Sequence, residues 1–158
     1  MSNLNHVPNP SIAWNKGKLV GQKPPLKLKE AWSIRIRLQI ANRNRDLALF
    51  NLAIDSKLQS CDLLRLRVRY VTHGGTIAKR AMIMQQKTRR PVQFEIMEQT
   101  RTAIGNWIAD AKLNNGDYLF KSRYRNSPHI STRQYARIVG SWVSEIGLDP
   151  TAYGTHSL

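Results

Sequence analysis

Most of the side chains in this sequence that could do chemistry are cationic. Its 158 residues include 25 Lys and Arg against 10 Asp and Glu, a formal net charge of +15 at pH 7. Guanidinium and ammonium groups form charge-assisted hydrogen bonds with phosphate oxygens. A folded chain with this imbalance usually meets a polyanion, so nucleic acid is the first candidate partner.

Other site chemistries find little support. Cys61 is the only cysteine, so no intrachain disulfide is possible, and we expect its side chain to act as a small buried apolar group. The four histidines show no zinc-binding spacing, and no metal or cofactor is expected. An anionic membrane surface is the second candidate partner, but no apolar run approaches the length of a spanning helix and no signal peptide is evident. We therefore expect a cytoplasmic protein without a membrane partner.

Composition divides the chain into an arm and one domain. Residues 1–25 are rich in Asn, Pro, Gly and Lys and are expected to form a basic, flexible arm. The alternative is an arm that lies along DNA or packs on the domain. With 41% hydrophobic residues overall, the chain can bury a core, and residues 26–158 are predicted to form a single domain.

Hydrophobic spacing predicts mostly helix. Residues 26–41 are ambiguous, because alternate residues are apolar from Ile34 to Ile40, while four-residue steps also link Leu28, Trp32, Ile36 and Ile40. The length of the stretch and its lack of turn residues favour a helix. Further helices are predicted over three segments: 45–56, apolar on nearly every face and therefore central; 97–113; and 131–148, capped by Ser131 or Thr132.

The middle of the chain predicts a β-ribbon. Residues 59–71 begin with a helical pattern and become β-like at Val68–Val71, and "HGG" at 73–75 marks a turn. Two strands are predicted at 76–86 and 90–96, with the turn at 87–89. At the end of the chain, "YGTHSL" predicts a helix start capped by Thr155. The expected fold class is mainly α with a small antiparallel β-ribbon, an α+β domain.

Three stretches, in this order, resemble one known family. They are "QSCDLLRLRVRYV" (59–71), the hairpin "AMIMQQKTRRPVQFEI" (81–96) and the terminal "YGTHSL" after an amphipathic helix. Together they are similar to the catalytic domain of the tyrosine recombinases, the phage integrase family. That family has an Arg three residues before an acidic-Leu pair, a Lys in a β-hairpin turn, a His-x-x-Arg box, a further His or Trp, and a C-terminal Tyr. The resemblance covers roughly residue 26 to the end.

The resemblance implies DNA strand cleavage and rejoining, as in DNA integration and recombination by mobile genetic elements. In such enzymes a Tyr hydroxyl attacks a DNA phosphate, two Arg and an imidazole stabilise the transition state, and a hairpin Lys protonates the leaving group. On this resemblance, Lys87 matches the hairpin Lys and His156 the first residue of the box. Asp62 matches the acidic position, where it is expected to orient its neighbours.

Two departures from the family pattern predict lost cleavage. Gln59 occupies the position of the first catalytic Arg, and its amide carries no charge and no bidentate fork for phosphate. The printed chain also stops two residues after His156, so it lacks the Arg of the box and the nucleophilic Tyr. We therefore expect a C-terminally truncated integrase-like catalytic domain, either decayed or a fragment, that is cleavage-defective as given.

DNA binding is the part of the implied function least affected. Six arginines flank the ribbon and the predicted last helix near the phosphate path that the resemblance implies: Arg89, Arg90, Arg123, Arg125, Arg133 and Arg137. The expected partner is double-stranded DNA, with association of several copies on DNA possible and a bacterial-type, nucleoid-associated location. A non-enzymatic DNA-binding accessory protein and a basic RNA-binding protein remain the alternatives.

Overall fold

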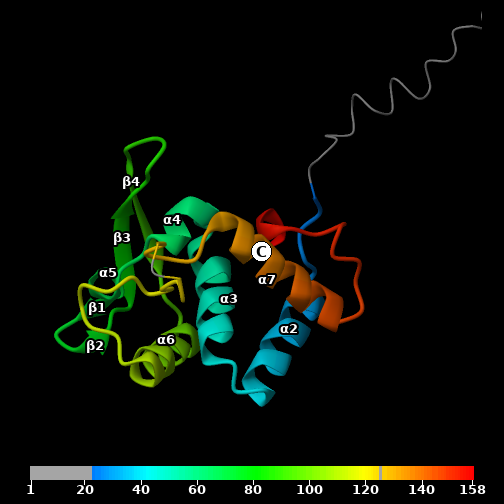
Figure 1. Ribbon diagram of the computed structural model, residues 1–158, viewed down its shortest axis with the longest axis horizontal. Helices are drawn as coiled ribbons and strands as arrows, with labels where there is room; N and C mark the ends of the chain where they lie inside the picture. Colours follow the sequence, from blue (N-terminus) through cyan, green and yellow to red (C-terminus); the bar gives the residue numbers. More distant parts are fainter. Residues whose placement is uncertain (1–22, 125) are drawn as a thin grey trace, which may run out of the picture.

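The structure is a computed structural model that describes residues 23–124 and 126–158. Arg125 and most of the predicted arm, residues 1–22, lie outside this range. The described chain is mainly helical with two small antiparallel sheets, which confirms the predicted fold class (Figure 1). Within these ranges, no helix has the length and apolar character needed to cross a bilayer.

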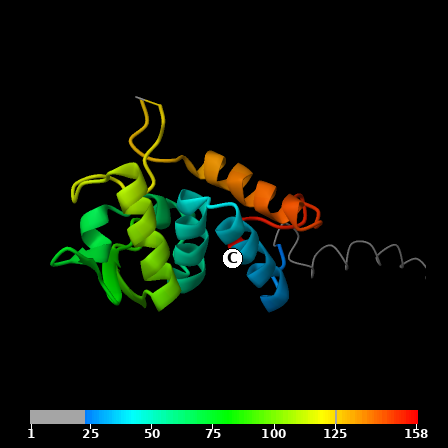
Figure 2. The same ribbon diagram turned by 90° about the horizontal axis from the view of Figure 1, so that it is seen from below.

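Helix α3 (Asn44–Ser56) lies at the centre of the domain, as its apolar sequence predicted. Phe50, Leu49 and Leu52 are fully buried in it. Helices α2 (Leu28–Ile40) and α6 (Glu98–Ala111) pack on its two sides, and the three lie in a row in Figure 2. Because α3 has neighbours on nearly all sides, it needs apolar residues on nearly every face.

Helix α2 confirms the helical alternative for residues 26–41, but the four-residue series does not face the core. Ile34 and Leu38 are the buried side chains, each 1% exposed. Leu28 and Ile40, by contrast, are 88% and 77% exposed. Ile34 and Leu38 therefore lie on the buried side of the helix, and Trp32 and Ile40 lie on its exposed side. The apparent alternation arises because this one helix is apolar on two sides.

The β-structure differs from the predicted single ribbon. Residues 68–71 form a short helix, α5 (Val68–Val71), where a β-like stretch was predicted, and α4 (Ser60–Leu64) precedes it. Strands β1 (Thr72–His73) and β2 (Thr76–Ile77) make one tight hairpin. Its turn requires glycine, since Gly74 and Gly75 have φ of 61° and 85°. The predicted strand 76–86 is therefore interrupted at Ala78 and Lys79.

The second hairpin carries the predicted turn. Strand β3 (Arg80–Met84) pairs with β4 (Pro91–Glu95), from Arg80 opposite Glu95 to Met84 opposite Pro91. The connection runs from residue 85 to 90, around the predicted turn at 87–89. This hairpin projects from one end of the domain (Figure 1). The tip of this hairpin is therefore held away from the rest of the described domain.

Helix α7 (Thr132–Glu145) packs across α2 and α4 and leads into the C-terminal segment. Ser131 caps it, because its Oγ accepts a hydrogen bond from the Gln134 amide at 3.1 Å. After Gly147, which has φ of 86°, the chain returns to a 3₁₀ turn, η1 (Thr155–Ser157). Thr155 lies inside this turn and Gly154 precedes it as the N-cap, so the predicted cap at Thr155 was wrong.

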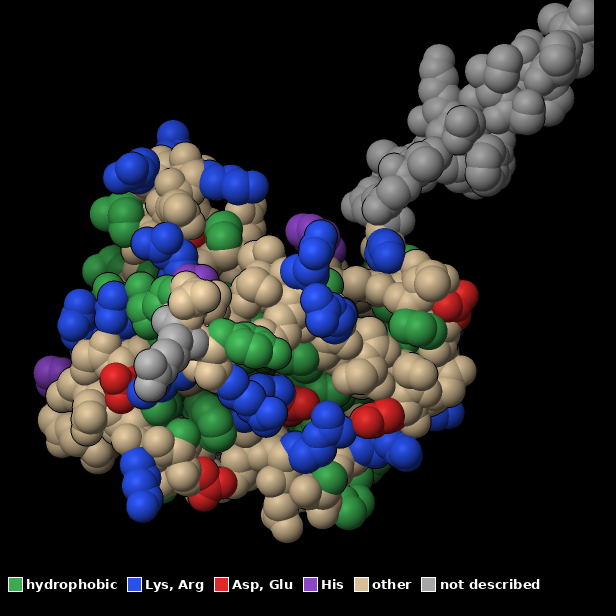
Figure 3. All heavy atoms as spheres, in the orientation of Figure 1, with side chains coloured by type: hydrophobic (Ala, Val, Ile, Leu, Met, Phe, Trp, Pro, Cys, Tyr) green, Lys and Arg blue, Asp and Glu red, His purple; other side chains and the backbone are tan. Residues whose placement is uncertain are grey.

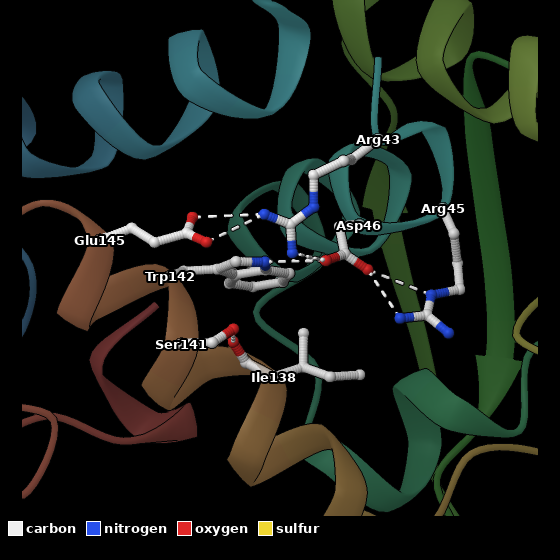
Figure 4. Close-up of polar contacts among 7 residues, drawn as sticks. All are labelled: Arg43, Arg45, Asp46, Ile138, Ser141, Trp142 and Glu145. Atoms are coloured by element: carbon white, nitrogen blue, oxygen red, sulfur yellow. Dashed lines mark hydrogen bonds and ion pairs between the residues drawn. The ribbon is translucent and has the colours of Figure 1, made fainter. Parts of the chain in front are cut away.

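A buried carboxylate joins α3 to α7 (Figure 4). Asp46 is 4% exposed and accepts a hydrogen bond from the Trp142 indole at 3.1 Å. Arg43 and Arg45 pair with the same carboxylate at 3.1 and 3.0 Å, and Arg43 also reaches Glu145 at 3.1 Å. A buried charge needs such partners to offset its lost hydration. Trp142 is itself buried, with its ring edge-on to Phe50 at 5.5 Å between centroids.

We expect Asp46→Ala to lower the free energy of unfolding by about 3 kcal/mol, since it leaves Trp142 and two guanidinium groups without their shared acceptor. For a chain of this size that corresponds to a melting temperature lower by roughly 6–12 °C. Glu145→Ala, at the exposed end of the same network, is the matched control and is expected to cost less than about 1 kcal/mol. Equal effects of the two variants in a thermal melt would contradict this account.

Candidate functional site

Gln59 and His156 line the same small cleft, although they are far apart in the sequence. The cleft has a volume of about 130 Å³ and lies between the start of α4 and η1. Its other lining residues are Ala53, Lys57, Leu58, Ser60, Tyr135, Thr155 and Leu158. The structure therefore brings together the two residues that the sequence assigned to the first Arg position and to the His box.

The backbone explains why these side chains meet. Lys57 ends α3 in the left-handed conformation, with φ of 57°, and Gln59 is extended before α4 begins. On the other side, the Leu26 amide donates to the Ser157 carbonyl oxygen at 2.9 Å. The Gly154 amide donates to the Ser157 hydroxyl at 3.1 Å. These bonds hold η1, and with it His156, beside the domain.

The cleft offers hydrogen bonds to an anion but no guanidinium. Gln59, Lys57 and His156 are exposed at its edge, so their donors are accessible. Tyr135 contributes a hydroxyl but is 2% exposed, and burial raises the pKa of this phenol well above its usual range. Because the phenolate is disfavoured, Tyr135 is suited to packing rather than to nucleophilic attack.

Asp62 holds the Lys87 hairpin to α4. Its carboxylate is buried, and Oδ1 accepts a hydrogen bond from the Gln86 amide at 3.0 Å. Lys87 follows directly and is exposed in the turn. It is not among the residues that line the small cleft, so the structure leaves Lys87 apart from Gln59 and His156 while tethering its turn to the helix that Gln59 begins.

We expect Asp62→Ala to free this turn. The lost acceptor should cost about 1–3 kcal/mol locally, so exchange of the Gln86 amide should accelerate by roughly tenfold to a hundredfold. Amide hydrogen exchange followed by NMR measures this directly. Asp62→Asn, which keeps an Oδ1 acceptor, should retain most of the protection. Unchanged exchange at Gln86 in Asp62→Ala would contradict an anchoring role.

A larger groove lies on the other side of Asp62, between α4–α5 and the β3–β4 hairpin. Its volume is about 630 Å³, and four arginines line it: Arg65, Arg67, Arg69 and Arg89. We call it the arginine groove. Arg67 is fixed in place, because it donates to the Gly116 carbonyl and the Tyr118 hydroxyl at 2.7 and 3.0 Å and stacks on the Tyr118 ring at 4.0 Å. Arg65 and Arg89 are exposed, so their guanidinium groups can reach a ligand.

The sequence predicted only Arg89 of this groove. The signal for the others was "RLRVR" at 65–69, in which every second residue is Arg. In the folded chain Leu66 and Val68 point into the core, at 1% and 2% exposure. The alternation therefore places the three arginines away from the core and beside the hairpin.

The remaining predicted arginines are spread over the surface rather than gathered in one pocket. Arg90 is exposed in the hairpin connection and Arg123 in the loop before α7. Arg133 and Arg137 are exposed one turn apart on α7, and Arg125 lies outside the described residues. Figure 3 shows Lys and Arg around the hairpin tip and across this face, with few acidic side chains between them. Their role in DNA binding stays a prediction.

Metal chemistry finds no ready site in the part of the chain that is described. No group of three or more His, Cys, Asp or Glu there is placed to hold an ion. Cys61 is half-buried, less enclosed than the sequence predicted. The cationic and amide side chains that line the small cleft and the arginine groove suit anion binding better than metal binding.

Comparison with solved structures agrees with the arrangement of elements, whereas no family model and no curated protein matches the sequence. XerA recombinase superposes with a TM-score of 0.69 at 16% identity, over 86% of this chain and 48% of that one. XerH site-specific recombinase, in a post-cleavage complex with its difH substrate, gives 0.66 at 16% identity over 88% and 41%. The pre-cleavage XerH complex gives 0.62 at 15% identity over 89% and 42%.

At these identities the likeness establishes the fold. The chain spans less than half the length of the recombinases that it matches. Between 86% and 89% of its own length takes part in the match. The chain therefore has a tyrosine-recombinase catalytic-domain-like fold.

Proposed function

We propose that this chain binds double-stranded DNA as a recombinase-type catalytic domain and does not cleave it. The observation that carries the proposal is the arginine groove beside the projecting hairpin, on a fold shared with recombinases. XerH was crystallised with its DNA substrate. A basic groove on the same fold supports the same class of partner for this chain.

Phosphate groups are the chemistry that the groove fits best. Guanidinium groups bind phosphate oxygens in a bidentate manner and stay charged at all physiological pH values. Arg65 and Arg89 are accessible there, while Arg67 is fixed against Tyr118 in the same lining. Backbone contacts of this kind fix the position of a duplex without reading its sequence. Arg90, Arg123, Arg133 and Arg137 extend the basic surface in this proposal.

In the small cleft the same proposal assigns phosphate binding without catalysis. Gln59 and His156 can donate hydrogen bonds to a phosphate, and Lys57 supplies one nearby charge. Losing a transition-state donor typically costs 10²–10³ in rate, about 2.7–4 kcal/mol, and loss of the charge of an Arg should cost at least as much. Lys87 would remain in the hairpin that Asp62 tethers and could still donate a proton as a general acid. The small cleft would nevertheless lack the Arg that stabilises the transition state.

A competition experiment tests the choice of partner. Labelled duplex DNA bound to the chain should be displaced by unlabelled duplex more effectively than by RNA of the same length and charge, since the recombinase fold is expected to match the shape of a B-form duplex. Better displacement by RNA would reject the proposal in favour of a basic RNA-binding protein.

Association of several copies on one duplex, which also belongs to the proposal, would appear as stepwise mobility shifts. Binding to DNA would also bring the chain to the nucleoid.

A further inference from the structure

The outer side of α2 carries an exposed apolar stripe that the proposed DNA binding does not use. It consists of Leu28, Trp32, Ile36 and Ile40, spaced one turn apart along the helix. Leu28 is 88% exposed, Trp32 60% and Ile40 77%, and Ile36 is partly buried. Large apolar side chains that lie next to each other on a surface usually mark an interaction site. In Figure 1, α2 lies at the end of the domain away from the β3–β4 hairpin.

The core does not need these side chains. Ile34 and Leu38 attach α2 to the domain from its opposite side, and both are 1% exposed. Substituting the stripe with polar residues would therefore leave the packing of α2 intact. Its apolar character is better explained by something outside the described chain that covers it.

Charge indicates what the covering group is. Lys27, Lys29 and Arg37 are exposed around the stripe, and none of them forms an ion pair with another described residue. Glu30 is the only acidic residue between positions 23 and 43, and its carboxylate accepts a hydrogen bond from the Lys27 amide at 2.8 Å. A second copy of this chain would bring the same cations to the interface, on a molecule of net charge +15. Like charges at close range disfavour that pairing.

We propose that the apolar stripe of α2 docks an acidic amphipathic helix of a protein partner. A helix fits because side chains at four-residue steps form a ridge that packs into the groove of a neighbouring helix. The 13 residues of α2 extend over roughly 20 Å, which is enough for three to four turns of a partner. Apolar residues of the partner would cover Trp32 and Ile40, and its Asp or Glu side chains would face Lys29 and Arg37.

A lipid surface fits less well. Lys29 precedes Ile36 by seven residues, nearly two full turns, so both point to the same side. Gln39 is related to Trp32 in the same way. Polar groups within the apolar stripe can pair with a protein partner, whereas insertion into a bilayer would place them among acyl chains.

The test uses a synthetic 18-residue acidic helix with Leu at four-residue steps and Glu on both sides, labelled for fluorescence anisotropy. A peptide of the same composition in scrambled order is the control for charge alone. We expect the full chain to bind the patterned peptide about tenfold more tightly, and Trp32→Ser and Ile40→Ser to weaken that binding about tenfold each. Met84→Ser, which removes a 59%-exposed apolar side chain on β3, should have no effect.

Charge is tested separately. Lys29→Glu should weaken peptide binding more than Lys79→Glu, which makes the same charge change at an exposed position of the β2–β3 connection. Trp32→Ser should leave DNA affinity unchanged. Equal binding of patterned and scrambled peptides would overturn the proposal. The proposal would also be overturned if the chain sedimented with phosphatidylserine vesicles in a Trp32-dependent manner and did not bind the patterned peptide.

Discussion

The affinity of the chain for duplex DNA is expected to fall by about 10³–10⁵ between 50 and 200 mM salt, if six to ten phosphates are engaged. The physical reason is the release of counterions from the DNA as lysines and arginines neutralise phosphates. The arginine groove and the exposed arginines of the hairpin and α7 provide enough cations for that number of contacts. Fluorescence anisotropy with a labelled duplex at several salt concentrations measures the slope.

Single substitutions connect this slope to the groove. Arg65→Ala and Arg89→Ala should each reduce the magnitude of the log–log slope by about 1, because each removes one phosphate contact. Lys29→Ala, which removes an exposed cation from the opposite end of the domain, is the matched control and should leave the slope unchanged. A groove variant that behaves like Lys29→Ala would show that the duplex lies elsewhere on the surface.

No covalent protein–DNA adduct is expected when the chain is incubated with a suicide substrate, a nicked duplex that traps strand cleavage. Gln59 cannot supply the charge or the fork that stabilises the phosphoryl transition state. Of the tyrosines described, Tyr135 is the one in the cleft, and its buried hydroxyl resists ionisation. Denaturing gel electrophoresis after incubation shows whether an adduct forms, and its appearance would disprove the defect.

Gln59→Arg provides the positive counterpart. A guanidinium at the edge of the small cleft should add a bidentate phosphate contact and raise DNA affinity by about tenfold, which corresponds to about 1.4 kcal/mol. Gln99→Arg, at an exposed position of α6, adds the same charge away from the cleft and controls for net charge. Equal gains from the two variants would mean that Gln59 does not occupy the first Arg position of the resemblance.

Local sequence patterns were reliable where one element decided the outcome. The Ser131 cap and the apolar face of residues 131–148 correctly predicted a helix, which the structure ends at Glu145, and the apolar run at 45–56 correctly predicted a central helix. These patterns failed where the residue types of one segment are compatible with both a strand and a helix. At Val68–Val71 the β-branched residues suggested a strand, but the Val68 and Arg69 amides donate to carbonyls of the Asp117 and Asn115 loop, and the segment closes into a helical turn.

For the candidate site, too, some features could be predicted from the sequence and others depend on the tertiary structure. From composition and periodicity, the sequence determined a strongly basic chain of mainly helical fold, and the resemblance predicted that Gln59 takes the place of a catalytic Arg. The proximity of Gln59 to His156, the tether from Asp62 to the Lys87 turn and the arginine groove were decided by tertiary structure. So was the exposed side of α2, because a four-residue period specifies that a helix forms but not which side of it the rest of the chain covers. Periodicity is a property of neighbouring residues, whereas a binding surface depends on which distant segments pack together.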